Sequence, residues 1–153
     1  MNYEEKLKTL GYALPDPPPK GGVYTPCKEF GENLVYVSGC GPKIGGENYL
    51  GKLGKDISFE DGQKAAVNAT LNVLAVLKHG LGSLDKVKSM VKALVFVASA
   101  DDFYQQPQVA NAATSLLVDI FGEEAGCPAR SAVGANVLPG NIAVEIEMLV
   151  EVS

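Results

Sequence analysis

The sequence predicts an α+β fold in which two amphipathic helices cover one face of a mixed sheet of about six strands. Three observations support this class. From residue 142 to 152, apolar side chains alternate with mostly acidic ones, which is typical of a strand with one buried face. Residues 91–97 are valine-rich and almost continuously apolar, which indicates a central strand covered on both faces. Two segments, 58–81 and 99–122, carry apolar residues at helical spacing.

The beginning of the chain predicts a helix followed by a stiff connector. Residues 2–10 have the pattern of a short helix that ends at Gly11. The proline-rich run 15–19 fits neither a helix nor a central strand, so we expect it to be extended. We therefore divide the chain into an N-terminal helix and connector, 1–22, and a single domain, 23–153.

Two strands and a long loop follow the connector. The pattern predicts two strands, 23–30 and 34–38, on either side of a turn at 31–33. Residues 39–56 hold six glycines and few apolar side chains, which indicates a loop. A short strand near 49–51 fits within that loop.

Capping signals mark the ends of the two long helices. Ser58 can cap the first helix, and Gly80 can close it. The Ser-Ala-Asp-Asp run at 99–102 is a helix-start signal, and the second helix should end near Gly122. If both helices cover one face of the sheet, its other face needs a partner, so we expect a homo-oligomer.

The C-terminal part of the chain predicts a hairpin that carries a small-acid site. An extended run begins after Pro128, and a turn at 138–141 separates it from the alternating strand. The hairpin would bring Arg130, the lone arginine of the chain, onto the same sheet as the carboxylates of that strand. A guanidinium beside a positioned carboxylate is an arrangement that suits binding of a small organic acid.

Composition narrows the classes of function. The chain of 153 residues has a formal net charge of −5, and its lysines are scattered, so we expect no nucleic-acid partner. No apolar run approaches the roughly 18 residues of a membrane span. Because the N-terminus also lacks the layout of a secretion signal, we expect a cytoplasmic protein without a membrane partner.

Cysteine and histidine give no sign of a metal, redox or nucleophilic site. The three cysteines are far apart and form no Cys-x-x-Cys motif, so Cys40 and Cys127 read as small residues rather than nucleophiles. His79, the single histidine, falls near a predicted helix C-terminus, where an imidazole fits the helix dipole. We expect neither a metal nor a cofactor.

Several short stretches occur in the order seen in the RidA/YjgF family. The chain resembles these reactive-intermediate (enamine/imine) deaminases, often labelled endoribonuclease L-PSP, over roughly residues 20–153. The Pro-Ala-Arg-Ser run and the Val-Glu-Ile-Glu strand, at their mutual spacing, are the most specific parts. The matching stretches are Gly22–Tyr24, Leu34–Gly39, Gly82–Val87, Val95–Val97, Asp102–Phe103, Pro128–Ser131 and Val144–Glu147.

This resemblance implies a fold, an assembly and an activity. The family has a chorismate-mutase-like α+β fold and forms trimers whose sheets line a central barrel, with active sites between subunits. Its best-known members hydrolyse 2-aminoacrylate and related imines to 2-keto acids and ammonia without a cofactor. By position, Arg130 would grip the substrate carboxylate and Glu145 would position the attacking water. The residues implied to lie beside the ligand are Tyr24, Gly39, Ser131 and Ala132.

The chain also departs from the usual family pattern. Cys40 follows Ser-Gly where active members usually have glutamine, and Ala132 replaces a common cysteine. The segment 104–119 is about two helical turns longer than usual, and the N-terminal helix with its prolines is extra. These differences indicate an outlying branch, and they leave the side chain of the substrate open.

Each site residue has a second interpretation that the residues alone leave open. Arg130 could form a structural ion pair, and Tyr24 could simply pack at the start of a strand. Glu145 could be one of several solvated glutamates like Glu147, and only its position in the motif favours it. The deaminase interpretation requires Arg130 and Glu145 to meet across a subunit boundary, with room for a flat acid and one water.

Three functions are compatible with these observations. The first is a trimeric hydrolase of enamines or imines of 2-amino acids. The second is a non-catalytic trimer that binds a small carboxylate metabolite or a partner protein. The third is the ribonuclease named in the family's older label, which the acidic charge and the single histidine oppose.

Overall fold

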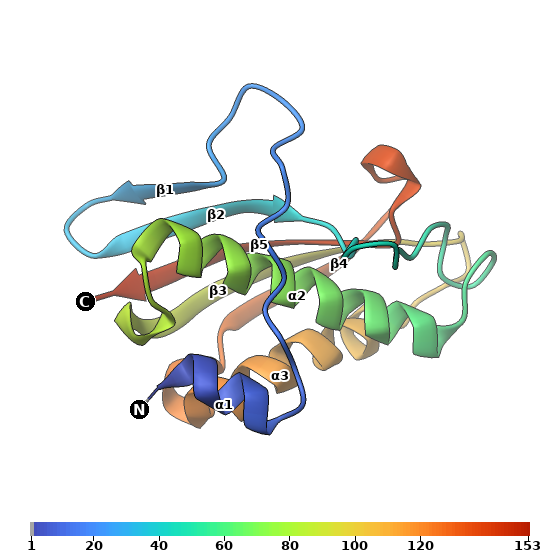
Figure 1. The fold of residues 1–153 in the computed structure, drawn as a ribbon. Coiled ribbons are helices and arrows are strands. Elements are labelled where there is room, and N and C mark those ends of the chain that lie inside the picture. The colour runs from blue at the N-terminus through green and yellow to red at the C-terminus, as the bar shows by residue number, and fades with distance from the viewer. Residues whose placement is uncertain (1) are drawn as a thin grey trace.

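A computed structural model describes residues 2–153 as two layers, a five-stranded sheet with helices on one of its faces (Figure 1). The α+β class is confirmed, with five strands rather than about six. The elements are α1 (Tyr3–Thr9), β1 (Cys27–Phe30), β2 (Leu34–Cys40), α2 (Phe59–Leu81), η1 (Leu84–Lys86), β3 (Val87–Ala98), α3 (Gln106–Gly126), β4 (Ala129–Ala135), η2 (Pro139–Asn141) and β5 (Val144–Val152).

The strand order is β1-β2-β5-β3-β4, and β5 lies at the centre of the sheet. β5 pairs antiparallel with β2 on one side and with β3 on the other, whereas β4 pairs parallel with β3. The predicted hairpin between the last two strands is therefore wrong. Because α3 connects β3 to β4 as a crossover, β4 lies parallel beside β3, and the chain must then pass β3 to reach the β5 position.

The alternating pattern of the last strand is confirmed by its burial. The apolar side chains of β5 are buried, as Val144, Ile146 and Val150 show, whereas Glu145 and Glu147 are only partly buried. The apolar face of β5 therefore lies against the helices. The prediction that the valine-rich strand is covered on both faces is wrong for a single chain. Residues of β3 alternate between buried and half-buried, because α2 and α3 both lie on the same side of the sheet (Figure 1).

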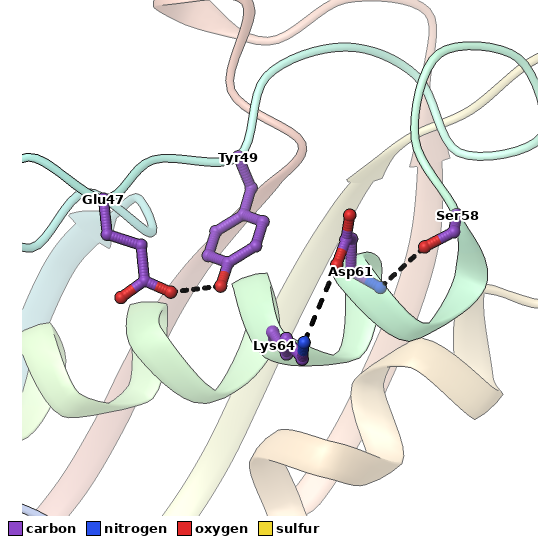
Figure 2. A network of polar contacts seen from close by, with 5 residues as sticks. All are labelled: Glu47, Tyr49, Ser58, Asp61 and Lys64. Atoms are coloured by element: carbon purple, nitrogen blue, oxygen red, sulfur yellow. Dashed lines mark hydrogen bonds and ion pairs between the residues drawn. The ribbon is translucent and has the colours of Figure 1, made fainter.

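The first long helix begins as predicted and ends two residues later than predicted. The Ser58 hydroxyl accepts a hydrogen bond from the Asp61 N–H at 3.1 Å. Figure 2 shows this cap beside the Lys64–Asp61 contact, with the Tyr49 hydroxyl bound to Glu47 on the preceding loop. The helix closes at Gly82 rather than Gly80, since Gly82 has a φ of 88°.

The second long helix begins later than its start signal. Residue 99 still belongs to the edge of the sheet, where the Ser99 N–H donates to the Ala135 carbonyl at 2.9 Å. The helix therefore starts at Gln106, where Pro107 fits the first turn. Its expected end at Gly122 is a break in the helical conformation, with a φ of 86°, after which the helix continues to Gly126.

The N-terminal segment packs onto the helical layer and then crosses it. The short helix α1 forms as predicted, and its Leu7 side chain is 1% exposed within the common core. The Tyr3 ring lies 4.5 Å from the Phe121 ring, and the Tyr3 N–H donates to the Asp85 carboxylate at 2.9 Å. From α1 the chain runs in front of α2 towards β2 (Figure 1). Position 1 of the predicted 1–22 segment lies outside the described residues.

The segment after the prolines is not a strand until Cys27, four residues later than the sequence predicts. The Gly21 N–H donates to the Tyr24 hydroxyl at 2.9 Å, which closes a local turn, and Pro26 has no N–H to offer a neighbouring strand. We call residues 12–21, which link α1 to this turn, the strap.

Replacing Leu7 with Ala should lower the free energy of unfolding by about 2–3 kcal/mol, because it removes the buried anchor of the strap. The matched change Leu10→Ala should cost well under about 1 kcal/mol, since Leu10 is 36% exposed. Urea denaturation of both variants measures the difference. Equal losses would contradict a specific anchoring role for Leu7.

Candidate functional site

A cavity of about 510 Å³ opens at the edge of β2, where β1 stops. β1 pairs with Leu34–Val37, and the Ser38 N–H still donates to the Pro26 carbonyl at 2.9 Å, so β1 leaves Gly39 and Cys40 at the end of β2 without a partner strand on that side. The pairing of β2 with β5 also shifts register between Val37 and Cys40, and such bulges often lie next to active sites. The cavity lining includes Pro18, Pro19, Lys20, Gly21, Tyr24, Pro26, Ser38, Gly39, Cys40, Gly41, Lys43, Val76, Pro139, Gly140, Ile142 and Glu145.

Three of the predicted site residues, Tyr24, Gly39 and Glu145, line this cavity together. Gly39 lies so close to Glu145 that an added Cβ would overlap the Glu145 carboxylate oxygen and lie 3.0 Å from its Cδ. Only glycine leaves room for this carboxyl group beside the β2 backbone. Tyr24 is 44% exposed, and its hydroxyl is held by Gly21, so it lies at the rim rather than in the core.

Glu145 and its neighbour Glu147 lie in different settings. Partial burial, followed by the nearby charge of Glu147, raises the pKa of the Glu145 carboxyl above its usual range. Glu147 accepts a hydrogen bond from the Tyr36 hydroxyl at 2.8 Å, and it lines an adjoining hollow that Glu145, Tyr24 and Gly39 also border. Glu145 borders both hollows, whereas Glu147 borders only the second one.

The Cys40 thiol is not activated as a nucleophile, although Cys40 lines the cavity. Burial, and then the charge of Glu145, raises the pKa of its thiol to about 12. Since the thiolate is the reactive form of cysteine, Cys40 is not set up as a nucleophile at neutral pH. Cys127 is exposed and lies between α3 and β4, away from the cavity lining.

Arg130 lies on β4 and is held by α3. Its Nη1 donates to the Asn111 Oδ1 at 2.6 Å and to the Thr114 hydroxyl at 3.4 Å. Within residues 2–153 the ion pairs are Lys64–Asp61 and Lys88–Glu151, so the alternative of a structural ion pair at Arg130 is not observed there. The guanidinium is oriented by neutral partners and keeps its charge available for an anion.

Arg130 and Glu145 do not meet within one chain. Arg130 is in register with Ala93, and Glu145 is in register with Phe96, three residues further along β3. An odd offset places the two side chains on opposite faces of the sheet. They are also separated by roughly 10 Å across two strand spacings and roughly 10 Å along the strands.

The other two predicted residues follow Arg130 on β4. The Ser131 hydroxyl accepts a hydrogen bond from the Lys92 ammonium at 2.8 Å. Ala132 is half-buried and packs against the core. The predicted set therefore forms two groups, one in the cavity and one on the edge strand.

The sequence did not point to several residues that line the cavity. Lys20 comes from the strap and Lys43 from the loop after β2, and no periodicity or motif marks either one. Asn72 on α2 holds that loop, because its buried amide donates to the carbonyls of Gly41 at 2.9 Å and Lys43 at 3.0 Å. A lone asparagine within an apolar helix face was the only available signal.

Residues 2–153 show no sign of a metal site or of a membrane-spanning helix. No three His, Cys, Asp or Glu side chains gather there in a way that could hold a metal ion. The helices of this part of the chain are all too short or too polar to span a membrane.

Comparison with known proteins assigns the family. Residues 4–152 match the family model described as "YjgF/chorismate mutase-like, putative endoribonuclease". The chain belongs to this YjgF/RidA family, as the sequence motifs predicted. The matched region begins within α1, so it includes the strap.

Similar proteins place the chain in an outlying branch of the family. It is 41% identical to Protein TCP17 of Trypanosoma cruzi, over 96% of this chain and 92% of that protein. A crystal structure of an Agrobacterium tumefaciens protein of unknown function superposes with a TM-score of 0.91 at 38% identity, covering 99% and 92% of the two chains. RidA from an Antarctic Psychrobacter species gives a TM-score of 0.59 at 26% identity, covering 90% and 94%.

In the native protein a chromogenic disulfide reagent should modify Cys127 first, Cys27 more slowly and Cys40 only after unfolding. This order follows from their exposed, half-buried and buried positions. Counting thiols released over time in native and denaturing buffer measures it, with Cys127→Ser as the control that removes the fast phase. A fast phase that Cys40→Ser abolishes instead would contradict the assignment.

Glu145→Gln should stabilise the protein at neutral pH. Because the folded-state pKa of Glu145 is raised, its charged form opposes folding above that pKa, and the cost disappears as pH falls towards the usual value near 4.5. The melting temperature of the variant should exceed that of the wild type at pH 7 and converge with it near pH 4. A constant difference across this range would exclude titration of Glu145 as the cause.

Proposed function

We propose that the protein hydrolyses 2-aminoacrylate-type enamines and their imine tautomers to 2-keto acids and ammonia. The observation that carries this proposal is the half-buried carboxyl of Glu145 in a cavity walled by Tyr24 and Gly39. Membership of the family and similarity to a protein named RidA support the same chemistry. The reaction needs no cofactor.

The reaction requires one group that moves protons. Water adds to the C2 carbon of the imine while Glu145 takes a proton from that water. Glu145 then passes this proton to the nitrogen, which gives a carbinolamine with OH and NH2 on C2. The hydroxyl proton is transferred to the nitrogen as well, the C–N bond breaks, and ammonia leaves a carbonyl at C2. A carboxyl group whose pKa is raised above its usual range by burial suits this exchange, which typically contributes about 10²–10⁴-fold to the rate.

Arg130 supplies the second requirement, a grip on the substrate carboxylate. A guanidinium binds a planar carboxylate with two parallel hydrogen bonds, which a lysine cannot reproduce. Since Arg130 and Glu145 of one chain point to opposite faces, the Arg130 of each site comes from a neighbouring subunit. A homotrimer closed through the uncovered face and edges of the sheet, with Ser131 and Ala132 beside the ligand, meets this requirement.

Substitution at either residue should nearly eliminate hydrolysis at substrate concentrations below the wild-type KM, for a different reason in each case. Arg130→Ala should raise KM for the imine by at least about 30-fold, and Glu145→Gln should lower kcat by about 10²–10⁴-fold. Trapping of the imine by semicarbazide, with and without protein, measures the hydrolysis rate. Glu151→Gln is the matched control, because Glu151 carries the same charge on the same strand and borders neither hollow that Glu145 lines.

A mixture of the two inactive variants tests whether the site is shared. If Arg130 and Glu145 come from different subunits, random trimers of Arg130→Ala and Glu145→Gln chains rebuild an intact pair at about one interface in four. The mixed sample, refolded together, should recover roughly a quarter of the wild-type rate. No recovery in mixed trimers of verified composition would reject a site built across subunits.

The cavity also supports a second function, non-catalytic binding of a small carboxylate metabolite. Lys20 and Lys43 line it, and within one chain Arg130 stays bound to α3. Binding of a 2-keto acid without hydrolysis of any imine would favour this function. Ribonuclease activity is opposed by the net charge of −5.

A further inference from the structure

We propose that the preferred substrate is a 2-imino acid whose side chain ends in a second carboxylate, and that Lys20 and Lys43 bind this group. This inference rests on the proposed hydrolase function and names the substrate class for the same cavity. It is carried by the size of the cavity, by the position of the two lysines and by the way each is held there.

The cavity is larger than the smallest imine requires. Its volume of about 510 Å³ lies within the roughly 300–1,000 Å³ of sites that bind ligands of many atoms. 2-Aminoacrylate has only a methylene group beyond its amino and carboxylate groups. The cavity, which both Glu145 and the strap line, therefore has room for a longer side chain.

The walls show what such a side chain should contain. Pro18, Pro19 and Ile142 offer apolar surface, which suits methylene groups. Glu145 is the one carboxylate among the lining residues, whereas Lys20 and Lys43 contribute two ammonium groups. With Glu145 engaged at the reacting carbon, the lysines attract an anion at the far end of the substrate.

Both lysines lack a carboxylate partner within residues 2–153, where the ion pairs involve only Lys64 and Lys88. Each is held near the cavity through its backbone. Asn72 binds the carbonyl of Lys43 at 3.0 Å, and the turn closed by Gly21 and Tyr24 follows Lys20 directly. Both residues are exposed, so their ammonium groups are free to turn towards an anion in the cavity.

The strap contributes this specificity from outside the sheet. It makes no strand pairing, and it is anchored at one end by Leu7 of α1 and at the other by the Gly21–Tyr24 hydrogen bond. Between these points it lays Pro18–Gly21 along the cavity. The N-terminal segment thereby becomes part of the substrate pocket.

Hydrolysis of two imines of equal length tests the proposal. Amino acid oxidases generate 2-iminoglutarate from glutamate and 2-iminopentanoate from norvaline, and semicarbazide trapping measures the loss of each. The wild type should favour the diacid by about tenfold or more in kcat/KM. Lys20→Met and Lys43→Met should each reduce this preference by about two- to fivefold, the range of a partly exposed ion pair. Added salt should reduce the preference as well.

Lys55→Met is the matched control, because Lys55 is exposed and does not line the cavity. A preference unchanged in both cavity variants, or a wild type that favours 2-iminopentanoate, would overturn the inference while leaving the hydrolase function intact. Absence of hydrolysis with both imines and with 2-aminoacrylate would instead reject the hydrolase function.

A binding measurement tests whether Lys20 and Lys43 bind the second carboxylate, even if no imine is hydrolysed. Calorimetric titration with 2-oxoglutarate and with 2-oxopentanoate compares a diacid with its monoacid counterpart. Tighter binding of 2-oxoglutarate that weakens in Lys20→Met and Lys43→Met, but not in Lys55→Met, supports the two lysines as its site. Equal affinity for the two keto acids would refute it.

Discussion

The position of β5 between β2 and β3 is the constraint on which the rest of the structure depends. Hydrogen bonds on both edges fix its register, so its apolar side chains must face α2 and α3. Glu145 is then forced to the other face, where the bulge in β2 and the missing side chain of Gly39 make room for it. The burial of an apolar core thus determines where a carboxyl group is placed.

The predicted site residues form two separate groups, so a single chain does not contain the complete proposed site. The cavity holds Glu145 with Tyr24 and Gly39, and Arg130 lies on the far edge strand against Asn111. The face of the sheet away from the helices stays open in one chain. Association would cover that face and, in the proposed trimer, bring the two groups together.

Local patterns were enough to predict much of this fold and part of the site. The alternation in β5, the cap at Ser58 and the helical spacing of α2 depend on neighbours in the sequence, and the structure has all three. The parallel pairing of β4 with β3 depends on a crossover that no local pattern specifies, and the hairpin prediction failed there. The presence of Lys20 and Glu145 in one cavity likewise depends on tertiary packing of the strap, because the two residues lie far apart in the chain.

The strap lines the cavity but takes no part in the sheet, so ligand binding can change there without a change in the fold. Because Pro18–Gly21 line the cavity and belong to no strand, mutations among them alter the cavity and leave the strand pairing of the sheet untouched. A lineage can therefore explore new ligands there at little risk to its stability. For the same reason, a bulky tag fused ahead of α1 is a poor choice for any assay of ligand choice, and a tag placed after Ser153 is a safer one.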